Sequence, residues 1–215
     1  NNDNLLLLAQ VFDGSNKIKD AKLSSFQLSE ELGILKTIKD VGNTLSDLNG
    51  RFMIMEMWHE TNSQKSGVIE RKVHFSNNPF KRIYSGPHIG VCNPLFKTSR
   101  RECKLNSDYD NIDLINIAFD YSQRTNYVPG KSHEEYMDAI VDNEWSGKVT
   151  NDYRLVARKM LNLGGERTFI SAIIPPKTTH INGLLGFDFK DLDELALAEA
   201  MFSSIPFDYF VRTLN

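Results

Sequence analysis

The most concentrated chemistry in this sequence is a basic cluster in its middle third. Its members are Lys97, Arg100, Arg101 and Lys104, with Lys81 and Arg82 a short distance upstream. Lysine and arginine on loops beside a rigid sheet suit contact with phosphate, and the planar guanidinium of arginine also suits bidentate hydrogen bonding to guanine. The cluster therefore predicts contact with a nucleic acid, although a run of charges is also typical of an ordinary solvated surface.

Two further segments carry side chains that suit the same chemistry. Arg124 and Asn126 lie in the irregular region that follows the cluster, and we expect them to be able to reach base edges. Lys177 lies in a loop that follows two prolines. Together with the basic cluster, these three residues complete the predicted DNA-contact set.

Other combinations of chemically active residues are incomplete. His59-Glu60 begins like the zinc-binding helix of a metalloprotease, but position 63, where the second histidine is needed, is a serine. His88, Cys92 and Cys103 would supply three ligands where a structural zinc site needs four. We therefore predict no metal site, and we interpret these three residues as a buried histidine and two free thiols in the core. Because the common nucleophile, phosphate-loop and calcium-loop motifs are also absent, we predict no catalytic residue in the chain.

Composition limits the kind of binding site that the chain can carry. Its 215 residues suffice for one large domain or two small ones, and its formal net charge is -3, so a DNA site must be a local basic patch on a mildly acidic body. Two cysteines without a secretory signal favour a reducing, cytoplasmic location, and the apolar run Leu5 to Leu8 is too short to cross a membrane. Since the chain begins at Asn1 without an initiator methionine and ends without a polar tail, we expect a piece of a longer protein.

Hydrophobic periodicity predicts an α+β fold, with a mixed or antiparallel sheet, inserted helices and a long irregular loop region. We interpret residues 5–12 as a strand and expect a helix that is capped by Ser29 and stopped at Gly42. Alternating side chains predict strands at residues 51–58, 69–75 and 82–92, the first with both faces buried and the last broken at Gly86-Pro87. The irregular stretch follows at residues 93–131.

The second half has clearer local signals. Ser132 and Glu135 have the spacing of a capping box, which predicts a helix to about Asp142. Two apolar runs around Gly164-Gly165 predict a hairpin, and Asp191 is the expected cap of a helix from Leu192 to Phe202. We divide the chain into a helical or linker segment at residues 1–47 and a larger domain at residues 48–215.

Seven short segments, in this order, resemble the C-terminal target-recognition region of large adenine-specific (N6) DNA methyltransferases. That group includes fused restriction-methylation (type IIG) enzymes and phage-defence methylases. The segments are Trp58-His59-Glu60-Thr61, Ser85-Gly86-Pro87-His88, Asn93 to Arg101, Arg124 to Pro129, Gly165-Glu166-Arg167-Thr168, Ile173-Ile174-Pro175-Pro176 and Ser203 to Asp208. Each is short, but they span nearly the whole chain from about Leu45 onward.

The resemblance implies which half of such an enzyme this is. Asn93-Pro94-Leu95-Phe96 looks like the catalytic Asn-Pro-Pro-Tyr/Phe motif that binds a flipped adenine, but Leu95 replaces the second proline. No glycine-rich turn for S-adenosylmethionine precedes it. We therefore interpret it as an Asn-Pro turn of the recognition half. The resemblance places the catalytic motif and the cofactor upstream of this chain, and it implies that Arg167 and Pro175-Pro176 belong to the scaffold.

The expected function is thus DNA target recognition for a site-specific adenine-N6 methyltransferase. Its partners would be double-stranded DNA and the catalytic methyltransferase domain of the same polypeptide. No cofactor is expected in this chain, whereas S-adenosylmethionine is expected in the intact enzyme. Two alternatives remain open: a protein-interaction domain of a defence complex without DNA contact, which the net charge favours, and a stand-alone enzyme of unknown class.

Overall fold

The computed structural model describes residues 2–21, 30–41 and 44–213, and these residues form an α+β fold. The predicted fold class is therefore confirmed. Contacts between residues group the chain into two compact units. The helical unit consists of the described residues of Asn1–Asn49 together with Leu163–Thr168 and residues 204–213, and the sheet unit consists of Gly50–Asn162 and Phe169–Ser203. The boundary predicted between residues 47 and 48 stays a prediction.

The helical unit joins the beginning of the chain to its end. Its elements are α1 (Asn2–Asp13), α2 (Glu30–Val41), α6 (Ile205–Thr213) and two 3₁₀ turns at Ile18–Asp20 and Leu45–Leu48. The ring of Phe12 in α1 stacks on Phe210 in α6, with 6.1 Å between centroids. Arg212 donates hydrogen bonds to the carbonyls of Leu163 and Gly165. Aromatic packing and these hydrogen bonds therefore join α6 to segments of the helical unit that are distant from it in sequence.

The prediction of a strand at residues 5–12 is wrong, because this segment lies inside helix α1. Leucine is a good helix former, and the apolar side chains of Leu5, Leu8 and Phe12 recur at the spacing of one helix face. The predicted cap Ser29 and stop Gly42 lie outside the described residues. The helix expected between them is confirmed as α2, which buries Leu35.

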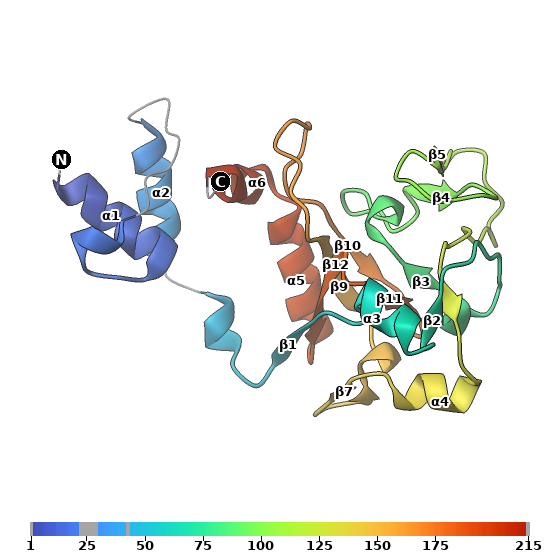
Figure 1. The fold of residues 1–215 in the computed structure, drawn as a ribbon. Coiled ribbons are helices and arrows are strands. Elements are labelled where there is room, and N and C mark those ends of the chain that lie inside the picture. Colours follow the sequence, from blue (N-terminus) through green and yellow to red (C-terminus); the bar gives the residue numbers. More distant parts are fainter. Residues whose placement is uncertain (1, 22–29, 42–43, 214–215) are drawn as a thin grey trace. The chain divides into compact units, whose positions relative to one another are not determined.

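A four-stranded antiparallel sheet forms the centre of the sheet unit (Figure 1). Its strands, in spatial order, are β1 (Phe52–Met55), β12 (Leu184–Phe189), β9 (Arg154–Arg158) and β10 (Ser171–Ile174). β9 and β10 confirm the predicted hairpin. Helix α5 (Leu192–Phe202) packs on β9, β10 and β12, and its cap is the predicted Asp191, whose side chain accepts from two backbone N–H groups.

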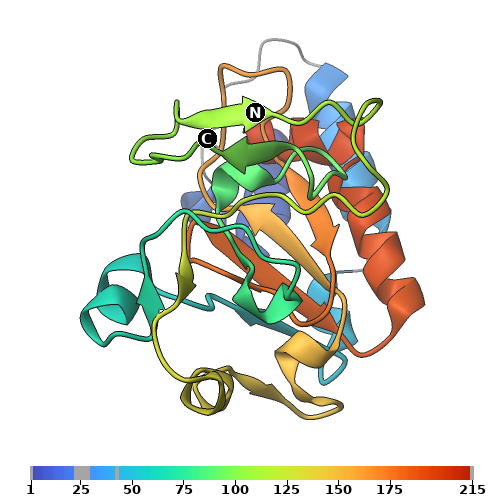
Figure 2. The same cartoon turned by 90° about the vertical axis from the view of Figure 1, so that its right-hand side faces the viewer.

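The rest of the sheet unit consists of short paired strands and loops (Figure 2). β3 (Ile83–Tyr84) pairs with β11 (Thr179–His180) in parallel, and the other three pairs are antiparallel. They are β2 (Ile69–Glu70) with β6 (Val128–Pro129), β4 (Lys97–Ser99) with β5 (Tyr109–Asn111), and β7 (Asp142–Asn143) with β8 (Gly147–Lys148). Two short helices, α3 (Glu60–Lys65) and α4 (His133–Asp138), and 3₁₀ turns at Pro79–Lys81, Gly86–His88 and Val149–Asn151 complete it.

Several predicted strands are shorter than expected. The strand predicted at residues 51–58 ends at Met55, and it is not buried on both faces, because β1 is an edge strand and Ile54 is 49% exposed. Of residues 69–75 only the first two form strand β2, and of residues 82–92 only Ile83–Tyr84 do. Between the first two predicted strands, residues 60–65 form helix α3. Periodicity marks extended backbone in these segments, whereas strand length depends on how many partner residues tertiary pairing supplies.

The capping box predicted at Ser132 is confirmed. The Ser132 side chain accepts from the Glu135 backbone, and the Glu135 carboxylate accepts from Ser132 in return. Those hydrogen bonds also lower the pKa of Glu135. The helix ends at Asp138 instead of Asp142, because residues 142–143 form strand β7.

The inner strand β12 lacked a sequence signal, because its sequence Leu-Leu-Gly-Phe-Asp-Phe contains two residue types that strands disfavour. The tertiary structure requires one of them. A Cβ atom at Gly186 would lie 2.6 Å from Nε2 of His180 and 3.3 Å from Met55. His180 is fully buried, so its ring has no room to move away. Gly186 thus allows β12 to pass close to β11.

We expect Gly186→Ala to destabilise the protein by about 2 kcal/mol, because the added methyl group overpacks the buried His180 ring. The free energy of unfolding from urea titration measures this loss. Gly183→Ala is the matched control, since its Cβ would meet nothing closer than 3.9 Å. Equal stability of the two variants would contradict the close packing of β12 on His180.

Candidate nucleic-acid interface

An irregular two-stranded ribbon separates two hollows that four of the predicted DNA-contact residues line. It consists of residues 69–75 and 125–129, and we call it the central ribbon. β2 and β6 form one end, and backbone hydrogen bonds continue the pairing: Lys72 donates to Asn126, and His74 and Thr125 exchange two. Successive side chains of an extended segment point to opposite faces. Val73 and Phe75 accordingly line one hollow, and Lys72 and His74 line another.

The first hollow, of about 490 Å³, is the arginine hollow, and it is lined by Val73, Phe75, Arg100, Arg101, Asp110 and Arg124. Arg100 donates to Asp110 at 2.8 Å, and this hydrogen bond raises the pKa of Arg100. Arg124 donates to the carbonyl of Ser99 at 2.8 Å. Arg101 is exposed, and within the described chain its guanidinium has neither an ion pair nor a hydrogen bond. The structure thus brings three of the predicted arginines to one hollow and leaves one of them uncompensated.

A buried histidine holds the segments that carry these arginines. His88 is fully buried, and its Nδ1 accepts from the Ser85 backbone at 3.0 Å. The proton therefore belongs on Nε2, which lies 3.2 Å from the Arg124 carbonyl and 3.3 Å from the Ser99 hydroxyl. Burial lowers the pKa of His88 to about 4, so the ring is neutral at pH 7. His88 thereby links the turn after β3 to both β4 and the central ribbon. The full burial of His88 confirms the prediction of a buried histidine.

Asn126 lies on the inner side of this network. Its side chain is buried, and its Oδ1 accepts a hydrogen bond from the Ser85 hydroxyl at 3.2 Å. The same hydroxyl lies 3.2 Å from the Tyr109 hydroxyl, and burial raises the pKa of Tyr109. In this structure Asn126 therefore supports the ribbon and has no access to a base edge.

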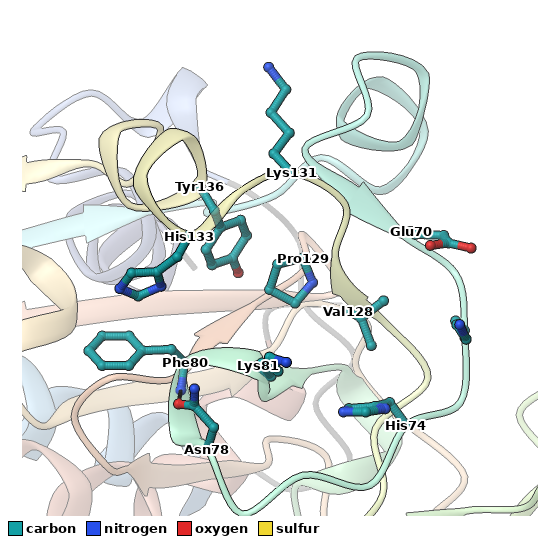
Figure 3. Close-up of a pocket in the computed structure, with 11 residues that line it drawn as sticks. Glu70, His74, Asn78, Phe80, Lys81, Val128, Pro129, Lys131, His133 and Tyr136 are labelled. Carbon is teal, nitrogen blue, oxygen red and sulfur yellow. Dashed lines mark hydrogen bonds between the residues drawn. The ribbon is translucent and has the colours of Figure 1, made fainter.

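The second hollow, also of about 490 Å³, is the lysine hollow (Figure 3). It is lined by Glu70, Lys72, His74, Asn78, Phe80, Lys81, Val128, Pro129, Lys131, His133 and Tyr136. Lys81 is the predicted contact residue that lies here, and Lys177 lies nearby, with its ammonium 5.8 Å from the ring centroid of Phe80. The structure therefore places Lys81 and the three arginines of the predicted contact set on opposite faces of the ribbon.

The remaining predicted contacts line neither hollow. Arg82 is half-buried and donates to the Ser122 hydroxyl at 2.6 Å, so it braces the loop. Lys97 lies over the ring of Phe96, with 5.3 Å from its ammonium to the centroid. Lys104 is exposed, and its carbonyl accepts from Arg71 at 2.6 Å.

The other chemically interesting residues form ordinary structure. The Asn93 side chain accepts from the backbone of Leu95, as in an Asn-Pro turn. Cys103 is buried as predicted, but Cys92 is exposed, so the prediction of two core thiols is wrong for Cys92. That cysteine lies in a turn with a positive φ of 52°, outside any regular packing face. Among the described residues, no group of three His, Cys, Asp or Glu side chains is arranged to hold a metal ion.

Comparison of the chain with protein-family models, curated proteins and solved structures finds no match. Within residues 2–21, 30–41 and 44–213, no helix combines the length and the apolar composition that a membrane crossing requires.

Sequence reasoning missed several residues that line the hollows. Lys72, His74, Lys131 and His133 were not singled out, because they lie outside the dense basic cluster at residues 97–104. The alternation at residues 69–75 was recognised, but only as a strand pattern. In residues 69–75, charged or ring side chains occur on both faces of the extended segment. This pattern could have predicted a binding surface on each face.

We expect acidification from pH 6.5 toward pH 4 to destabilise the protein. His88 and His180 both have a pKa lowered to about 4 by burial, so in this range the unfolded chain binds protons that the folded chain does not. Each histidine reduces the free energy of unfolding by up to about 1.4 kcal/mol per pH unit. Urea titrations at several pH values measure how the free energy of unfolding changes with pH. In His88→Gln this free energy will fall less steeply with acidification than in the wild type, whereas in the exposed-site control His133→Gln it will fall as steeply. Identical slopes for the His88 variant and the wild type would refute the buried neutral ring.

Proposed function

We propose that the sheet unit binds duplex DNA through the arginine hollow, as the target-recognition part of an adenine-N6 DNA methyltransferase. The observation that carries the proposal is the convergence of the neighbours Arg100 and Arg101 with Arg124, from a second loop segment, on one hollow. Convergence of guanidinium groups on a polyanion is the usual basis of DNA affinity, because phosphate neutralisation releases counterions.

The three arginines would contribute differently. Arg100 and Arg124 are held by Asp110 and by the Ser99 carbonyl, so their guanidinium planes are oriented before DNA arrives. Arg101 has no such partner within the described chain and is the freest to neutralise a phosphate or to bond guanine. Phe75, which is 56% exposed in the same hollow, offers an apolar surface to a sugar or to a thymine methyl group.

The methyltransferase assignment rests on the seven sequence segments that resemble this enzyme group. Under it, S-adenosylmethionine and the catalytic residues belong to a domain of the same polypeptide outside this chain. The sheet unit would hold the duplex while that domain flips the target adenine and methylates its N6. Loops mounted on a rigid sheet suit the recognition role, since they vary readily while the scaffold stays constant.

A second candidate function is binding of a protein partner. Three large apolar side chains, Leu114, Ile115 and Phe119, are 52%, 92% and 109% exposed in the loop after β5. The loop also carries Asp113 and Asp120, and the chain has a net charge of -3. An apolar, acidic loop suits a protein surface better than it suits DNA.

We expect Arg101→Gln to weaken the binding of mixed-sequence duplex DNA several-fold at low salt. It will also reduce the slope of log affinity against log salt by about one, because one phosphate contact is lost. Fluorescence anisotropy at three salt concentrations measures both quantities.

Lys190→Gln is the matched control, since it removes one exposed positive charge of the same unit outside the hollow. An unchanged slope for Arg101→Gln, or an equal loss for the control, would reject the arginine hollow as the DNA contact. Absence of binding by the wild-type chain at low salt would favour the protein-partner function.

A further inference from the structure

We propose that the lysine hollow is a separate binding site for a nucleoside 5′-phosphate group. This inference goes beyond the proposed duplex contact, because the lysine hollow lies on the opposite face of the central ribbon from the arginine hollow. The argument rests on three properties of the lining: uncompensated positive charge, an aromatic wall and a suitable size.

The three lysines of this hollow have no ion-pair partner within the described part of the chain. Lys72, Lys81 and Lys131 are exposed, and among the described residues none of their ammonium groups has an ion pair or a hydrogen bond. Glu70 is the one carboxylate in the lining. Figure 3 shows Glu70 at one side of the view and Lys81 in the middle of the lining, between Phe80 and His74. An anion placed beside Lys81 would therefore not meet a carboxylate first.

Flat rings form the wall next to Lys81. Phe80 and His133 meet edge to face, with 5.3 Å between centroids and an angle of 75°. Figure 3 shows these two rings side by side, with Tyr136 and then Pro129 next to them in the view. Aromatic and proline rings of this kind are the surfaces on which nucleic-acid bases stack, and stacking is tolerant of base identity.

The wall is held in place from behind. Tyr136 is buried, its hydroxyl accepts a hydrogen bond from the Trp58 indole at 3.0 Å, and it lies 2.7 Å from the Thr179 hydroxyl. The capping box at Ser132 fixes the start of the helix that carries His133 and Tyr136. The Asn78 side chain accepts from the Phe80 backbone and so fixes the turn that presents Phe80 and Lys81. A ligand would thus meet a preformed wall, which limits the entropy lost on binding.

The volume of about 490 Å³ lies within the range typical of small-molecule sites. Lysine supplies point charges for a phosphate, and the rings supply a platform for a base, so the combination matches a nucleotide better than either phosphate or a nucleoside alone. The nucleotide has two possible sources, a free mononucleotide or one nucleotide of a single strand. The chemistry of the site is the same for both.

The experiment is a titration of the whole chain with AMP, followed by the fluorescence of Trp58, whose indole contacts Tyr136 of the wall. Trp58→Phe identifies the part of the signal that comes from this tryptophan. Adenosine, inorganic phosphate and a short single-stranded oligonucleotide are titrated in parallel. We expect AMP or the oligonucleotide to bind at least about tenfold more tightly than adenosine or phosphate, since each of these lacks one half of the contacts. Preference for AMP would identify a free nucleotide as the source. Preference for the oligonucleotide would identify a strand if Lys81→Gln weakens that binding and Arg101→Gln does not, because the arginine hollow also contacts DNA in the proposed function.

Substitutions test the location. Lys81→Gln will weaken nucleotide binding by about tenfold, because a charge-assisted hydrogen bond is lost, whereas Lys190→Gln will leave it unchanged. Arg101→Gln will also leave it unchanged, although it weakens duplex binding if the proposed function holds. The two proposals can therefore fail independently of each other.

Three results would overturn the inference. They are no saturable binding of AMP or of the oligonucleotide at millimolar concentration, equal binding of phosphate and AMP, and equal effects of Lys81→Gln and Lys190→Gln. Far-ultraviolet circular dichroism of each variant checks that a loss of binding is not a loss of folding.

Discussion

A buried positive charge at the centre of the sheet unit constrains the elements around it. The side chain of Arg154 on β9 is fully buried, and burial lowers its pKa to about 10, which still leaves it protonated at neutral pH. A charge without solvent needs an opposing charge and hydrogen-bond acceptors. Asp188 lies opposite it on β12, and the Thr178 carbonyl accepts a hydrogen bond from its guanidinium. Thr178 directly precedes β11, which pairs with β3. The hydrogen bond from Arg154 to Thr178 therefore also helps to position β3, the strand before the turn that carries His88.

In the turn that follows β3, hydrogen bonds between neutral polar groups hold the structure together instead of charges. Burial holds His88 neutral, and Ser85, Ser99 and the Arg124 carbonyl surround its ring. Neutral hydrogen-bonded groups cost less to bury than ions, so this arrangement supports the arginines of the hollow without a buried charge beneath them. Asp188 responds to acid in the opposite sense to the two buried histidines. Burial raises its pKa to about 6, so between pH 6 and pH 4 the folded chain takes up this proton first and is stabilised by it.

The central ribbon explains how a chain with a net charge of -3 can present two cationic surfaces. Its alternating side chains direct Val73 and Phe75 to one face and Lys72 and His74 to the other. Arginines complete the first face, and lysines with aromatic rings complete the second. Guanidinium groups suit bidentate contact with phosphates and base edges, whereas ammonium groups beside rings suit a phosphate with an attached base. Local composition, and not the total charge, therefore decides what each face is fitted to bind.

The sequence by itself determined those features that depend on neighbours along the chain. The capping box at Ser132, the Asp191 cap of α5 and the hairpin of β9 and β10 all follow from side chains within a few residues of one another, and the α+β class follows from their succession. Tertiary structure alone decided the rest. Gly186 and Asp188 oppose strand formation locally, yet they lie in an inner strand because one makes room for His180 and the other faces Arg154. Likewise, the basic cluster was visible in the sequence, but the placement of Lys81 in one hollow and of Arg100 and Arg101 in the other depends on a ribbon whose two strands are about fifty to sixty residues apart in sequence. Long-range pairing and the volume available at a buried position have no local signature, and these are the quantities that place each candidate residue in its site.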